Sequence, residues 1–181
     1  MADYIYVDNS NLFIEGRRVS AVKKGMAKNI IEAMNNDILD KSYNINFGRL
    51  YEFLTGKDDK SVAKAFLFGS RPPPNDSIWQ YATRAGFELI LEDRNSANKE
   101  KKIDTGLTAK LVKHAYKNMD PKRDTAIVVA GDGDFVPAIR ELHEDLFKIE
   151  VVFWDHASKE LRKLSDKFIS LNDRLDYLSL K

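Results

Sequence analysis

The chain has 181 residues, of which 43% are hydrophobic, a composition typical of a globular domain. It contains no cysteine, which excludes disulfides, a thiol nucleophile and a cysteine-ligated zinc site. Its 29 basic and 28 acidic residues nearly cancel, so the chain is not the strongly basic protein expected of a nonspecific nucleic-acid coat. Any charged site must therefore come from local clustering.

Five short apolar runs rich in β-branched and aromatic residues predict buried strands, at 4–7, 65–68, 87–91, 125–130 and 149–154. Apolar residues at helical spacing predict helices over 107–119 and 135–146. A proline-rich turn at 71–74 precedes another helix near 77–85. Strands that alternate with helices predict an α/β fold with a mostly parallel sheet. No apolar run approaches the ~20 residues that span a bilayer, and the N-terminus lacks signal-peptide features, so we expect a cytoplasmic protein without membrane contact.

A long excursion at about 16–46 interrupts this alternation. Its apolar residues recur every four positions and predict an amphipathic helix: Val22, Met26, Ile30, Met34 and Ile38. Its first half is basic and contains no acid: Arg17, Arg18, Lys23, Lys24 and Lys28. Three interpretations stay open, namely an RNA-facing flap, a homodimer contact through the apolar stripe, and a helix packed on its own domain.

Aspartates follow two of the predicted strands. Asp8 ends the first strand, and Asp132 and Asp134 lie in the turn Ala-Gly-Asp-Gly-Asp-Phe directly after the strand at 125–130. The glycines of this turn should let the backbone bend tightly. If these two strands are parallel neighbours, their aspartates meet at the carboxyl edge of the sheet, where such sheets bind ligands. Asp104, at the predicted start of a helix, reaches this edge only if the loop before it crosses over.

Each aspartate also has a purely structural interpretation. Asp8, Asp104 and Asp134 could cap helices, and Asp132 could form a turn. Three or four carboxylates at one edge would repel one another, however, and a structural role gives no reason for that repulsion. Oxygen-only sites suit hard divalent cations such as Mg²⁺ or Mn²⁺. Together the acids therefore favour a metal site.

Basic residues precede Asp104, and one further acid follows the last long strand. The basic strip consists of Arg94, Lys99, Lys101 and Lys102. It is either a solvated loop or a phosphate-binding flank of the acidic site. Asp155 lies on the same predicted edge and is either an additional ligand or, as we expect, the cap of a helix that starts near Ser158.

Four blocks occur in order along the chain: VDNSN, KKIDTGL, VAGDGDF and the tail SKELRKLSDKFISL. In these blocks the sequence resembles the NYN domain, in particular the LabA-like branch of the PIN-like nuclease superfamily. The resemblance covers nearly the whole chain except the excursion at 16–46. It implies a single domain over 1–181 with a three-layer α/β/α Rossmann-like PIN fold and strand order 3-2-1-4-5.

The resemblance also implies an activity and a site. Asp8, Asp104, Asp132 and Asp134 carry over as the acidic metal site, and Asn11 as a nearby polar substrate contact. Other matching positions carry over as packing residues: Phe135, Leu161, Phe168 and Leu171. We therefore expect an Mg²⁺- or Mn²⁺-dependent endoribonuclease that hydrolyses RNA phosphodiesters. The alternative is an RNA-binding or regulatory module with little or no catalysis.

Two other phosphate-handling classes do not fit the sequence. A haloacid dehalogenase phosphatase needs a second aspartate two residues after the first, but Ser10 occupies that position. The P-loop pattern of nucleotide hydrolases is absent.

Overall fold

A six-stranded parallel sheet forms the centre of the protein, with the strand order β3-β2-β1-β4-β5-β6. The computed structural model describes residues 2–56, 61–71, 77–93 and 103–180. The strands are β1 (Asp3–Asp8), β2 (Val62–Arg71), β3 (Glu88–Asp93), β4 (Thr125–Val129), β5 (Lys148–Phe153) and β6 (Lys167–Ser170). The five strands expected from the sequence all form, in the expected order, and β6 extends the sheet beyond β5.

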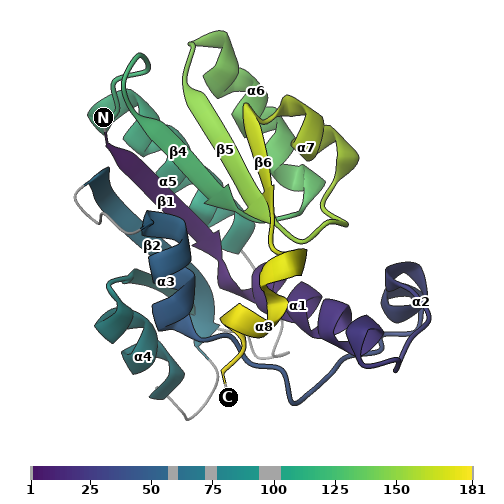
Figure 1. The fold of residues 1–181 in the computed structure, drawn as a ribbon. Helices are drawn as coiled ribbons and strands as arrows, with labels where there is room; N and C mark the ends of the chain where they lie inside the picture. Colours follow the sequence, from purple (N-terminus) through teal and green to yellow (C-terminus); the bar gives the residue numbers. More distant parts are fainter. Residues whose placement is uncertain (1, 57–60, 72–76, 94–102, 181) are drawn as a thin grey trace.

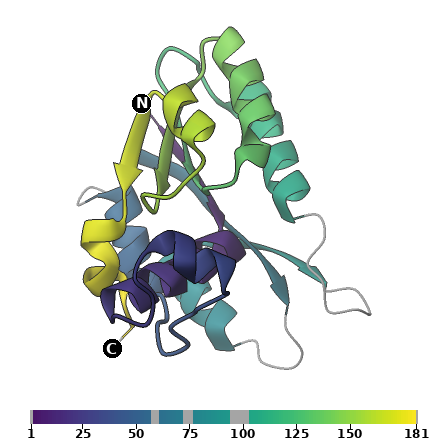
Figure 2. The same ribbon diagram turned by 90° about the vertical axis from the view of Figure 1, so that its right-hand side faces the viewer.

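Helices cover both faces of the sheet, as Figures 1 and 2 show. Helices of one face are α1 (Asn9–Lys23), α3 (Phe47–Thr55), α4 (Ser77–Ala85) and α8 (Leu175–Leu178). Those of the other are α5 (Ile103–Asn118), α6 (Val136–Glu144) and α7 (Lys159–Leu164). The short α2 (Ile30–Asn35) packs against α1. Two 3₁₀ turns complete the described chain, η2 (Gly133–Phe135) and η3 (Asn172–Arg174).

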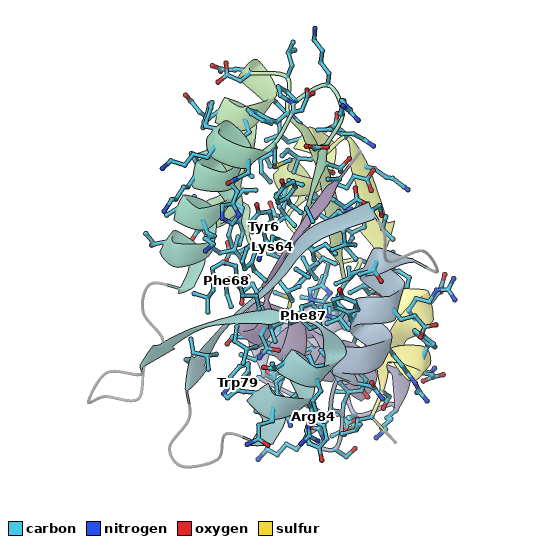
Figure 3. All side chains as sticks on the ribbon, turned by 90° about the vertical axis from the view of Figure 1, so that its left-hand side faces the viewer. Tyr6, Lys64, Phe68, Trp79, Arg84 and Phe87 are labelled. Carbon is cyan, nitrogen blue, oxygen red and sulfur yellow. The ribbon has the colours of Figure 1, made fainter. Side chains whose placement is uncertain are left out.

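Each face of the sheet carries its own hydrophobic core, because side chains alternate along a strand. Tyr6 and Phe68 pack on the α5 side, whereas Trp79 and Phe87 belong to the core on the α4 side (Figure 3). Every residue of β4 is buried, as expected for a central parallel strand covered on both faces. The α/β/α layering predicted from the sequence is confirmed.

The packing positions carried over from the family are confirmed too. Phe135, Leu161 and Leu171 are fully buried. Phe168, on β6, is partly buried and packs against both cores. The tail of the chain therefore adds the edge strand β6 next to β5.

The prediction of one amphipathic helix through 22–38 is wrong. Helix α1 starts much earlier, at Asn9, and ends at Lys23. Gly25 then takes a left-handed conformation, with φ of 73°, which breaks the helix. Asn29 caps α2 by accepting a hydrogen bond from the Glu32 N–H. The apolar repeat thus does not form one buried stripe, and Met26 is 50% exposed.

Candidate active site

The carboxyl ends of β1 and β4 lie side by side. The two strands pair in parallel from Asp3 with Thr125 to Val7 with Val129. Asp8 therefore ends its strand at the edge where the chain leaves β4 for the turn at 131–134, and α1 begins there as well (Figure 1). The backbone brings these two acidic segments to one edge, as the sequence predicted.

Asp8 is buried, with 3% of its surface exposed. One of its carboxylate oxygens accepts a hydrogen bond from the Asn11 N–H at 3.0 Å, so Asp8 is the N-cap of α1. A carboxylate at a helix N-terminus is stabilised by the N–H groups and the positive end of the helix dipole. The structural role considered for Asp8 is thus present, and it fixes the direction of this carboxylate.

The turn after β4 is held from both sides. The Gly131 N–H donates to Oδ1 of Asn11 at 2.9 Å, and the Ser158 N–H donates to the carbonyl oxygen of Gly131 at 2.9 Å. Within the turn, Asp132 caps η2 by accepting a hydrogen bond from the Asp134 N–H at 3.0 Å. The side-chain oxygen of Asn11, predicted as a substrate contact, is therefore used to hold the acidic turn.

The structure shows a different reason for glycine at position 131 from the one predicted. Among the described glycines, a positive φ occurs at Gly25, Gly56 and Gly86, and not in this turn. At Gly131, a Cβ atom would instead overlap with the ring of Phe153. The glycine is needed because the turn packs directly on a buried aromatic ring of β5.

Asp132 and Asp134 are exposed, and neither forms an ion pair with a cation in the described part of the chain. Two neighbouring carboxylates without a cationic partner among the described residues concentrate negative charge at the edge and suit a bound cation. Among the described residues, no three His, Asp or Glu side chains are grouped closely enough to hold a metal ion. Asp8, Asp132 and Asp134 therefore do not make a complete metal site by themselves.

Asp104 lies in the first turn of α5. This helix runs antiparallel to the strands, because the hydroxyl of Tyr4 near the start of β1 donates to the carbonyl of Asn118 at the end of α5. Helix α5 also contacts η2. The backbone of Asp104 is thus at the carboxyl edge, whereas its side chain lies outside the described residues. The predicted basic strip also lies outside them: Arg94, Lys99, Lys101 and Lys102.

The prediction that Asp155 caps α7 is wrong. Ser158 is the N-cap and accepts a hydrogen bond from the Leu161 N–H. Asp155 follows β5 and is exposed, and its N–H donates to Oδ1 of Asn172 at 2.9 Å. A serine at the cap position explains the helix start without Asp155.

Basic residues of α1 and its C-cap residue Lys24 form contacts within the protein. Arg18 forms ion pairs with Glu15 and Asp37. Lys23 forms one with Asp176, and Lys24 forms one with Asp40. Helix α1 contacts β1, β2 and α8. The first part of the excursion, which lies in α1, therefore packs on its own domain, as one of the three interpretations states.

Sequence reasoning missed a buried charged group at this edge. Glu15, on α1, is 9% exposed and bridges Arg18 to His156, whose Nε2 lies 2.6 Å from the glutamate oxygen. The three-residue spacing of Glu15 and Arg18 is typical of a helical ion pair, but no sequence signal places His156 beside them. The contact joins α1 to the loop after β5.

The described part of the chain contains no helix that is long and apolar enough to cross a membrane.

Comparisons with known proteins identify the family. The crystal structure of VPA0982, a protein of unknown function from Vibrio parahaemolyticus, is similar, with a TM-score of 0.70 and 18% sequence identity over 99% of this chain and 96% of that one. At this identity the likeness shows the fold alone. No curated protein sequence matches the chain. The family model described as NYN domain matches residues 4–172. The chain therefore belongs to the NYN domain family, a family of PIN-like nucleases.

Proposed function

We propose that the protein is a metal-dependent endoribonuclease of the LabA-like branch, which hydrolyses RNA phosphodiesters at the carboxyl edge of the sheet with Mg²⁺ or Mn²⁺. The observation that carries this proposal is the pair Asp132 and Asp134, two exposed carboxylates without a cationic partner among the described residues, at the tip of a tightly held turn. Membership of a nuclease family supports the hydrolytic chemistry.

The donor set fits a hard divalent cation. Asp8, Asp132 and Asp134 supply only oxygen atoms, and Asp104 at the start of α5 would complete the set. Bound there, the ion would lower the pKa of a coordinated water and neutralise charge that develops on the phosphodiester.

The residues around the carboxylates would orient and support them. The hydrogen bond between Asn11 and Gly131 fixes the turn relative to α1, so that Asp132 does not have to be ordered when substrate binds. The buried position of Asp8 reduces the water around one carboxylate, which strengthens its interaction with a cation. We propose that Arg94, Lys99, Lys101 and Lys102 engage the RNA backbone, which their charge and their place before Asp104 support.

An Asp132→Asn variant tests the proposal. It keeps the size of the side chain and an oxygen that can accept from the Asp134 N–H, but it removes the charge. We expect RNA cleavage to fall at least about 100-fold in manganese-supplemented buffer, while the melting temperature in metal-free buffer equals that of the wild type. Asp173→Asn is the matched control, because Asp173 is an exposed aspartate in η3, outside the acidic turn. Wild-type cleavage by purified Asp132→Asn would refute the assignment.

A second candidate is an RNA-binding or regulatory module without catalysis. It is favoured by the lack of a metal-binding group of three among the described side chains. Thermal melting separates the two candidates, because an ion that binds only the folded state raises the melting temperature. The nuclease proposal predicts a rise at millimolar Mn²⁺ in the wild type that is reduced in Asp132→Asn. No rise in the wild type would favour the inert module.

A further inference from the structure

A pocket of about 630 Å³ lies between α1, α3 and α4, on the face of the sheet opposite α5. Its volume is within the range of small-molecule sites. Its walls combine apolar side chains with two amides: Phe13, Phe47, Ile78, Tyr81, Asn44 and Asn46. All of the described residues that line it are uncharged. The pocket is therefore suited to a flat, largely apolar group that also carries hydrogen-bonding edges.

One wall residue of the pocket, Phe13, lies on the helix that Asp8 caps. Phe13 is five residues after Asp8, which on a helix corresponds to about 7.5 Å along the axis of α1. Helix α1 thus carries both features, with Asp8 at its N-terminus and the pocket wall little more than one turn further on. A polymer lying across the carboxyl edge can reach both.

Apolar and aromatic surface is exposed at this pocket. The side chain of Tyr81 is 64% exposed and that of Ile78 is 37% exposed, although both belong to a helix whose inner face is buried. An exposed aromatic ring next to a hollow is a typical platform for a nucleobase, because every base has a π-face. Stacking on Tyr81 would shield this surface from water.

Positive charge borders the pocket. The guanidinium of Arg17 lies over the Phe13 ring at 4.1 Å and donates to the carbonyl oxygens of Tyr43 and Lys41. The guanidinium of Arg49 donates to the carbonyl oxygens of Tyr177 and Ser179, which lie just before the pocket residue Leu180. Neither arginine forms an ion pair with a carboxylate in the described chain. These two arginines therefore differ from Arg18 and Lys23, which form ion pairs with carboxylates.

A third arginine adds to this charge. Arg84 is exposed on α4, three residues after Tyr81, and so on a neighbouring part of the same helix surface. Figure 3 shows it at the end of this helix. A neutral aromatic pocket bordered by cations matches a base attached to a phosphodiester chain better than it matches an uncharged apolar partner.

We propose that this pocket binds an unpaired nucleobase of single-stranded RNA, with the base on Tyr81 and the arginines facing the backbone. The proposal rests on the proposed function, since it assigns to the same substrate a second point of attachment beside the acidic edge. It predicts a preference for single-stranded over double-stranded RNA, because a paired base is not free to enter a pocket.

Binding of a fluorescein-labelled, unstructured ten-nucleotide RNA, measured by anisotropy in EDTA, tests the proposal without cleavage. We expect Tyr81→Ala to weaken binding about tenfold or more and Tyr81→Phe to bind like the wild type, because the ring is kept. Tyr116→Ala is the matched control, since Tyr116 is 51% exposed but lies on α5, on the other face. A duplex of the same sequence should bind more weakly than the single strand.

Three results would overturn the proposal: equal affinity of Tyr81→Ala and wild type, equal affinity for the duplex and the single strand, or no RNA binding by the wild type. If sedimentation shows a wild-type dimer that Tyr81→Ala dissociates at unchanged RNA affinity, the pocket is a protein interface and the proposal is wrong. The outcome is separate from that of the nuclease proposal. Loss of RNA binding in Tyr81→Ala supports the base-binding pocket even if Asp132→Asn cleaves normally. Wild-type RNA affinity of Tyr81→Ala refutes the base-binding pocket and does not affect the nuclease proposal.

Discussion

The acidic turn at 131–134 and the two lysines at the end of α1, Lys23 and Lys24, are both charged clusters in the sequence, but their surroundings in the fold are opposite. Lys23 and Lys24 each meet a carboxylate that is distant along the chain, Asp176 and Asp40. In the acidic turn, the backbone is anchored by neutral hydrogen bonds, and the two carboxylates have no cationic partner among the described residues. Charge that is neutralised internally stabilises the fold, whereas charge left without a partner is available to a ligand.

The largest expected effect concerns the anchoring of the acidic turn. In Gly131→Ala the new methyl group overlaps with the Phe153 ring, which is buried and cannot move away without disturbing the core. We expect the free energy of unfolding, measured with urea, to fall by about 3 kcal/mol. Gly106→Ala is the control, since no described atom outside the helix backbone lies within 4 Å of the added atom and alanine favours a helix. A Gly131→Ala protein as stable as the wild type would show that the turn is loosely packed.

The next effect concerns Asp40, the buried carboxylate that pairs with Lys24. Asp40 is 4% exposed and accepts hydrogen bonds from Ser20 and Ser42, both at 2.6 Å, beside its ion pair with Lys24. We expect Asp40→Asn to lower the free energy of unfolding by about 2 kcal/mol at pH 7 while RNA cleavage stays unchanged. A cleavage defect in a stable Asp40→Asn protein would contradict the division between the two regions.

The same variant has a predicted pH dependence. Burial raises the pKa of Asp40, but the hydrogen bonds from Lys24, Ser20 and Ser42 outweigh burial and hold its pKa well below the usual range. The folded state therefore favours the ionised form, so its contribution is fully present above the unfolded pKa of about 3.9 and is lost as the pH falls toward the folded pKa. The difference in the free energy of unfolding between wild type and Asp40→Asn should therefore shrink as the pH falls from about 5 to about 3, across the unfolded pKa. A constant difference would contradict this assignment.

Asn11 links α1 to the acidic turn through an uncharged hydrogen bond. Asn11→Ala leaves the Gly131 N–H without its acceptor, and we expect a loss of about 1–2 kcal/mol in the free energy of unfolding. Cleavage should fall more than about tenfold at unchanged RNA affinity, because the carboxylates are less well positioned. If RNA affinity falls and the cleavage rate at saturation does not, Asn11 acts as a direct substrate contact instead.

The smallest effect is expected at Lys23. Its side chain is 55% exposed and that of its partner Asp176 is 77% exposed, so water screens the pair. Lys23→Gln should change the free energy of unfolding by less than about 0.5 kcal/mol. RNA affinity should stay within about twofold of the wild type. A much larger loss of affinity would mean that Lys23 itself contacts RNA.

Features that depend on local sequence were predictable. Apolar β-branched runs predicted the central strands, and the position of Asp8 and Asp132 after two of them placed both at one edge. The resemblance supplied the strand order, which hydropathy alone does not give. β6 was not predicted, because Lys167–Ser170 is short and pairs with one neighbour only, at the edge of the sheet.

Features that depend on contacts between distant residues were not predictable. The repeat at 22–38 has helical spacing, but the left-handed turn at Gly25 interrupts it, and a helical period does not reveal such a break. The ion pairs of Lys23 and Lys24 join residues far apart in sequence. The partnership of Glu15 with His156 likewise exists only because β5 ends beside α1.

A crystal structure with Mn²⁺, located by its anomalous scattering, tests the proposed metal site most directly. We expect manganese at the carboxyl edge of the sheet, bound by oxygen atoms of Asp8, Asp104, Asp132 and Asp134. Manganese absent from this edge at millimolar concentration, or Asp104 directed to a separate surface, would contradict the proposed site.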